Sequence, residues 1–68
     1  MMRKRVVSTN VTSVGYFAGV LEVEFHNGSV YHYYNVPESY YAQMINYPHP
    51  GKFLSKNVKG RYCYQRVA

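Results

Sequence analysis

The residues with the clearest potential for chemistry are cationic side chains near the end of the chain, interleaved with tyrosines. Cations and aromatic rings in this arrangement are typical of a strip that contacts phosphates, and such contacts position a nucleic acid without reading its sequence. A solvated helix face has the same composition, so both interpretations stay open. The candidate nucleic-acid-binding residues are Lys52, Lys56, Lys59, Arg61, Tyr62 and Arg66.

Charge is distributed unevenly along the 68 residues, which carry a formal net charge of +5. Basic side chains gather at residues 3–5 and 52–66, whereas all the carboxylates lie within residues 22–38. Clustered positive charge favours anionic partners, nucleic acid first among them. We expect residues 1–5 to form a mobile basic arm, because chain ends fray unless they are tied down, and residues 6–67 to form one domain.

Residues suited to catalysis or metal binding are scarce. The chain has no Asp, and its three His are scattered without the paired spacing of a zinc site. Basic neighbours could lower the pKa of Cys63, but a lone Cys in a small domain is more often a packed or idle thiol. We therefore expect no enzymatic activity, no catalytic residue, no metal site and no cofactor.

Composition also indicates the compartment. A single Cys cannot form an internal disulfide, which fits a reducing environment. No apolar run approaches the roughly 18 residues that a membrane span requires. No apolar segment follows the basic start, as it would in a signal peptide. We expect a cytoplasmic protein with no membrane partner.

The most strongly predicted element is a β-hairpin over residues 20–34. Residues 21–25 alternate apolar and polar side chains, which is the pattern of a half-buried strand. Asn27-Gly28 follows, and this dipeptide is a strong signal for a hairpin turn. Residues 30–34 then form the return strand.

Two registers of this hairpin are possible, and they place different side chains together. A two-residue turn puts Val23 opposite His32, whereas a three-residue turn with Gly28 in the left-handed conformation puts Val23 opposite Tyr31. We favour the second register, because it gathers the apolar side chains on one face. These are Leu21, Val23, Phe25, Tyr31 and Tyr33.

The tyrosines of the hairpin have two interpretations as well. The favoured register assigns Tyr31 and Tyr33 to the core, and the alternative is a platform on which single-stranded bases stack. Tyr34 on the other face, and Tyr62 or Tyr64 beside basic residues, are better candidates for exposed stacking.

The remaining segments complete an α+β fold. Residues 10–16 are rich in β-branched side chains and predict a strand, and the alternation over residues 61–67 predicts a last one. Helices are expected over residues 37–46 and 51–58, from proline at the first start and apolar stripes in both. We expect a small antiparallel sheet of three to four strands, built on the central β-hairpin and covered on one face by the two helices.

The order and spacing of these motifs resemble the KTSC domain family over about residues 6–67. The resemblance is carried by Val30-Tyr31-His32-Tyr33, by Leu21-Glu22-Val23-Glu24-Phe25 with Asn27-Gly28, and by Gly51-Lys52-Phe53. The family occurs at the C-terminus of some lysyl-tRNA synthetases and alone in bacterial and phage proteins, which implies a binding domain with RNA as the suggested ligand. One position departs from the family: His49 replaces the Ser that is usual two residues before Gly51, so this chain lacks that hydroxyl.

We therefore expect non-catalytic binding of nucleic acid, with RNA favoured over DNA, through residues 52–66. Two alternatives remain open. The first is a protein-interaction module, a homo-oligomer included, because tyrosine is enriched in interface cores. The second is a binder of a small anionic ligand or nucleotide, of phage or bacterial origin. A steep salt dependence favours nucleic acid, oligomers favour the first alternative, and saturable one-site titration favours the second.

Overall fold

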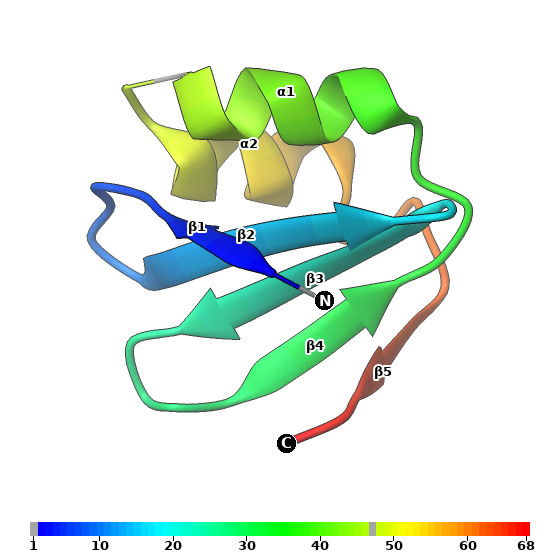
Figure 1. The fold of residues 1–68 in the computed structure, drawn as a ribbon, viewed down its shortest axis with the longest axis horizontal. Coiled ribbons are helices and arrows are strands. Elements are labelled where there is room, and N and C mark those ends of the chain that lie inside the picture. Colours follow the sequence, from blue (N-terminus) through cyan, green and yellow to red (C-terminus); the bar gives the residue numbers. More distant parts are fainter. Residues whose placement is uncertain (1, 47) are drawn as a thin grey trace.

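The computed structural model describes residues 2–46 and 48–68, which form a sheet with two helices on one side (Figure 1). The strands are β1 (Arg3–Arg5), β2 (Val11–Phe17), β3 (Val20–Phe25), β4 (Val30–Tyr33) and β5 (Tyr64–Arg66), and the helices are α1 (Glu38–Asn46) and α2 (Pro50–Asn57). All neighbouring strands are antiparallel, in the order β1-β2-β3-β4-β5. The fold is α+β as expected, with five strands rather than three to four.

The additional strand is β1, which we expected to be a mobile arm outside the domain. Its residues Arg3–Arg5 pair with Ser13–Gly15 of β2 and form one edge of the sheet. Backbone hydrogen bonds to β2 and an ion pair from Arg3 to Glu22 hold the strand in place. Residues 3–5 are therefore part of the sheet rather than a mobile arm.

The hairpin adopts the register that we favoured. Val23 is opposite Tyr31, and Leu21 is opposite Tyr33. The connecting loop has three residues, closed by a hydrogen bond from the Phe25 amide to the Ser29 carbonyl. Gly28 adopts a φ of 89°, which a residue with a Cβ rarely does.

The core lies between the helices and strands β2, β3 and β4, whereas the residues of β1 are all exposed. Its fully buried side chains include Leu21 and Val23 from β3, Met44 from α1 and Leu54 from α2. Leu54 and Val58 face inward as their spacing predicted. Both helices lie over the β1–β2 side of the sheet, and β4 and β5 extend beyond them (Figure 1). Part of the helix-facing surface of the sheet is therefore left without a helix.

No helix within the described ranges is long and apolar enough to cross a membrane.

Candidate functional site

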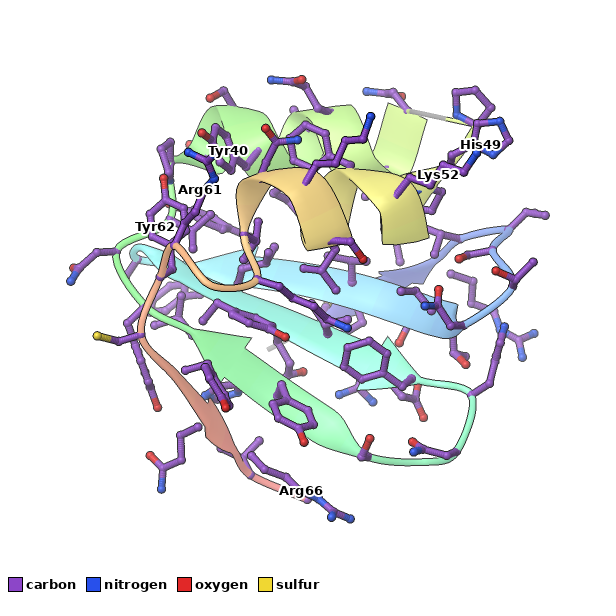
Figure 2. The ribbon with its side chains drawn as sticks, turned by 180° about the vertical axis from the view of Figure 1, so that it is seen from behind. Tyr40, His49, Lys52, Arg61, Tyr62 and Arg66 are labelled. Atoms are coloured by element: carbon purple, nitrogen blue, oxygen red, sulfur yellow. The ribbon has the colours of Figure 1, made fainter. Side chains whose placement is uncertain are left out.

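An open groove of about 680 Å³ lies on the part of the sheet that the helices do not cover. We call it the tyrosine groove. Its size is within the range typical of small-ligand sites in proteins. Ring side chains stand on β3 and β4 below α2 (Figure 2). The lining residues are Thr9, Asn10, Phe25, His26, Asn27, Ser29, Tyr31, Tyr33, Lys59, Gly60 and Tyr64.

Three tyrosines form a continuous aromatic surface in this groove. Tyr31 and Tyr33 lie two residues apart on the same face of β4, and their rings stack with centroids 6.3 Å apart. The ring centroid of Tyr64 on β5 lies 5.8 Å from each of theirs. Phe25 meets Tyr31 edge to face at 5.6 Å. Tyr33 is only 3% exposed, whereas Tyr64 is 62% exposed. The inner ring is therefore part of the core, and the outer ring is open to a ligand.

The phenol groups of these tyrosines are close enough to influence one another. Burial raises the pKa of Tyr33, and the neighbouring phenols of Tyr31 and Tyr64 raise it further. The Tyr33 hydroxyl therefore remains protonated near neutral pH and can donate a hydrogen bond.

The polar edge of the tyrosine groove is positively charged. Lys59 Nζ lies 5.2 Å from the centroid of the Phe25 ring, within the range of a cation–π contact. Asn27 also lines the groove, and its Oδ1 accepts hydrogen bonds from the Ser29 amide and hydroxyl at 3.0 and 2.6 Å. The lining contains no carboxylate.

A second groove, of about 890 Å³, lies against the start of α2. We call it the helix-end groove. It also lacks carboxylates, and it shares Thr9 and Asn10 with the tyrosine groove. Its lining residues are Val7, Ser8, Thr9, Asn10, Pro48, His49, Gly51, Lys52, Ser55 and Lys56.

The loop of residues 8–10 lies between the two grooves and is fixed on both sides. The Ser8 carbonyl accepts a hydrogen bond from His26 Nε2 at 2.8 Å, and the Thr12 hydroxyl contacts His26 Nδ1 at 2.6 Å. A carbonyl can only accept, so Nε2 of His26 carries a proton. On the other side the loop packs on Gly51, where any Cβ would collide with the Asn10 side chain.

Comparisons with known proteins identify the fold. The sequence model of the KTSC domain matches residues 7–62. The chain belongs to the KTSC domain family. The crystal structure of a KTSC domain protein from Yersinia pestis is 27% identical, with a TM-score of 0.88, and the match covers 98% of this chain and 97% of that one.

Much longer relatives match part of this chain. Lysine–tRNA ligases from Trichormus variabilis and Nostoc punctiforme are each 35% identical over 48 residues. The match covers 71% of this chain but only 9% of each ligase. The similarity is thus confined to a small part of those enzymes.

The KTSC fold brings together only some of the predicted binding residues. Lys52 and Lys56 line the helix-end groove, and Lys59, just past the end of α2, lines the tyrosine groove. Arg61 lies beside Tyr62 at the opposite end of the helix layer from Lys52, and Arg66 lies far below on β5 (Figure 2). The lysines follow α2 and its end, whereas Arg61 and Tyr62 lie in the turn beyond it and Arg66 lies on β5.

Tyr62 is a packing residue in this KTSC domain. It is half-buried against the core, and its ring meets Tyr40 edge to face at 6.0 Å. A hydrogen bond with Tyr40, together with burial and the nearby Tyr40 phenol, raises the pKa of Tyr62 despite the opposing charge of Arg61. Arg66 donates a hydrogen bond from Nε to the Ala68 carbonyl at 2.8 Å.

Sequence reasoning left Tyr31, Tyr33 and Tyr64 out of the predicted site. The alternation of Tyr64 and Arg66 placed both on one side of a last strand, and Tyr64 was considered for exposed stacking. Pairing of Tyr33 with Tyr64 across β4 and β5 brings the rings together. That pairing depends on residues distant in sequence, so periodicity within one segment could not show it.

His49 occupies the position that precedes α2, and its side chain forms no capping hydrogen bond. The first turn of α2 is instead started by Pro50, whose missing amide hydrogen removes one donor that would need a partner. Among the described residues, no group of three or more His, Cys or Glu side chains is placed to hold a metal ion.

Proposed function

We propose that this KTSC domain is a non-catalytic module that binds nucleic acid, with RNA favoured over DNA. The observation that carries the proposal is the path of three lysines along α2. Lys52 and Lys56 border the helix-end groove, and Lys59 borders the adjoining tyrosine groove. Since neither lining has a carboxylate, a chain of phosphates can follow the lysines without meeting a negative side chain.

The charges on the other face of the sheet support this choice of surface. There Glu22 and Glu24 lie close to Arg3, with contacts of 2.7 and 3.7 Å, so that positive and negative groups offset one another. No ion pair in the described ranges involves Lys52, Lys56 or Lys59. Within those ranges the charges of these lysines are therefore not offset by an ion pair, and a polyanion gains from binding beside them.

The preference for RNA is supported by the relatives. The lysine–tRNA ligases that match this chain bear names that connect them with tRNA, and the matched segment is a small part of each. A domain attached to an enzyme that handles tRNA is well placed to contact RNA. By the same reasoning the domain needs no catalytic residues of its own.

The test is an amide NMR titration of the domain with a short single-stranded RNA, run at about 50 and about 150 mM salt. We expect chemical-shift changes along α2 and in the two grooves, and these should persist at the higher salt. The same sequence as DNA should bind more weakly. Loss of all shifts at the higher salt would reduce the lysines to a general electrostatic effect and overturn the proposal.

A matched pair of variants connects the binding to the lysines. Lys56→Gln and Arg61→Gln each remove one exposed positive charge from the same part of the chain. Only Lys56 lines a groove, so Lys56→Gln should weaken binding clearly more than Arg61→Gln. Equal effects would show that the affinity follows net charge rather than this surface.

A further inference from the structure

We infer that the tyrosine groove is a stacking site for unpaired bases, so that the nucleic acid bound by this domain is single-stranded. The inference rests on the proposed function, since it assigns the class of ligand and one of its contacts. The evidence for it is the placement of the aromatic rings on the uncovered part of the sheet. This evidence is independent of the lysines along α2.

One aromatic ring in the groove, that of Tyr64, is largely exposed to solvent. Tyr64 is 62% exposed on the edge strand β5, although it lies within 5.8 Å of Tyr31 and Tyr33. The three rings are inclined to one another by 23° to 39°, so they offer faces rather than a closed herringbone. A flat base can extend this stack on the outer side of Tyr64 or Tyr31.

The floor of the groove is rigid. Tyr33 is buried and paired in the sheet with both Leu21 and Tyr64. Phe25 braces Tyr31 from the side at 5.6 Å. Because the Tyr31 and Tyr33 rings are already held in place, stacking a base against them requires little loss of freedom from these two side chains.

Groups at the edge of the groove match the other parts of a nucleotide. Lys59, held over the Phe25 ring, supplies a cation for a phosphate. Asn27 uses its oxygen to bind Ser29, which leaves the amide nitrogen to donate to a base. The lining has no carboxylate to repel the backbone.

Stacking of this kind selects against duplexes. In a double helix the base faces are covered by neighbouring base pairs, so a ring on a sheet can reach them only at the ends. Unpaired bases expose both faces, and every base has a face that an aromatic ring can stack on. The groove should therefore bind single strands with little preference for sequence.

The experiment measures fluorescence anisotropy of an end-labelled RNA at about 150 mM salt, as a single strand and as the matching duplex. The variants are Tyr64→Ala, which removes the exposed ring, and Tyr64→Phe, which keeps the ring and removes the hydroxyl. Phe17→Ala is the control, because Phe17 is 71% exposed but lies outside both grooves. Amide spectra verify that each variant is folded.

We expect the wild type to bind the single strand more tightly than the duplex. Tyr64→Ala should weaken single-strand binding by roughly 5- to 100-fold, whereas Tyr64→Phe and Phe17→Ala should stay within about twofold of wild type. In the wild type, the ring protons of Tyr64 should shift upfield when RNA is added, a sign of stacking that requires no substitution.

The outcomes separate the two proposals. If Tyr64→Ala binds like wild type while Lys56→Gln is weakened, the stacking site is wrong and nucleic-acid binding along α2 stands. If Tyr64→Phe loses as much as Tyr64→Ala, the hydroxyl rather than the ring carries the contact, which also overturns stacking. Equal affinity for duplex and single strand does the same. If the wild type binds no nucleic acid, both proposals fail.

Discussion

The guanidinium of Arg3 donates a 2.7 Å hydrogen bond to the carboxylate of Glu22, although a whole strand lies between their two strands. The intervening residue is Gly15, which is paired with Arg3 on one side and with Glu22 on the other. Because Gly15 has no side chain, Arg3 reaches across β2. His32 contacts the other oxygen of Glu22 at 2.7 Å from β4. One carboxylate thus connects three strands.

Acid should weaken this connection. Burial opposes ionisation of Glu22, but hydrogen bonds and positive charge from His32 and Arg3 outweigh it, so the pKa of Glu22 is lowered. A lowered pKa in the folded state adds stability above the unfolded-state value, and this is lost as pH falls through the folded-state value. Glu22→Gln should therefore lower the free energy of unfolding by about 1 kcal/mol at neutral pH, because it removes the negative charge and one of the two accepting oxygens.

Urea denaturation between about pH 7 and about pH 3 measures this effect. The wild type should lose stability as pH falls below about 5, and Glu22→Gln should lose less over the same interval. Glu38→Gln is the control, since it removes a carboxylate that forms no ion pair in residues 2–46 and 48–68. If Glu22→Gln has the same acid dependence as the wild type, Glu22 is not the titrating group.

Two tyrosine hydroxyls should contribute differently to stability. Tyr16 donates a hydrogen bond to the Val36 carbonyl at 2.6 Å in a partly buried position, just before α1. Tyr34 donates to Gln65 Oε1 at 3.2 Å on the surface. Tyr16→Phe leaves a carbonyl without its partner and should cost about 1 kcal/mol in urea denaturation, whereas Tyr34→Phe should cost less than half of that. Equal losses would contradict this ranking.

The parts of this fold that follow from nearby residues were predictable. The hairpin register depends on Gly28 and on the alternation of β3, all within one segment. The inward side of α2 depends on the spacing of Leu54 and Val58. In these cases the local pattern and the final packing select the same arrangement, so the prediction was confirmed.

Strand β1 was not predictable in the same way. Three consecutive cations show no alternation of apolar and polar side chains, so they give no strand signal. Backbone pairing at the edge of a sheet can form without such alternation. What favours the strand is a carboxylate 19 residues later, brought within reach by the pairing of β2 with β3. The formation of β1 therefore depends on contacts with the rest of the sheet and not on the pattern of residues 3–5.

The candidate site was predicted in part for a similar reason. The spacing of Lys52, Lys56 and Lys59 was visible in the sequence, and these lysines border the two grooves. The open position of Tyr64 depends on where the helices end relative to β5, which no local pattern indicates. Tyr62, with similar neighbours in the sequence, packs against Tyr40 instead.

Glycine at position 51 should be favoured by the nearby Asn10 side chain rather than by its own backbone conformation. A Cβ at this position would collide with the Asn10 side chain and approach Ser8 Oγ to 3.0 Å. Gly51→Ala should therefore force the exposed Asn10 side chain to rotate and lose its hydrogen bond with Ser8, a cost of up to about 1 kcal/mol that offsets the helix preference of alanine. In an Asn10→Ala background the main obstacle is gone, and the same substitution should become stabilising. A double-mutant cycle by thermal unfolding measures the coupling, and additive effects would show that the contact is unimportant.

The lysines of α2 should determine how steeply RNA affinity falls with salt. Each phosphate contact on a single strand adds roughly 0.7 to the slope of log affinity against log salt, because a bound cation releases a counterion. Lys56→Gln/Lys59→Gln should therefore flatten the slope by about 1.4 in anisotropy titrations over several salt concentrations. Lys4→Gln/Arg5→Gln removes the same charge from β1, at the opposite edge of the sheet from β5. If both double variants flatten the slope equally, the RNA responds to the charge of the whole domain. A change confined to the α2 pair instead places the phosphates beside the two grooves, because counterions are released only where contacts form.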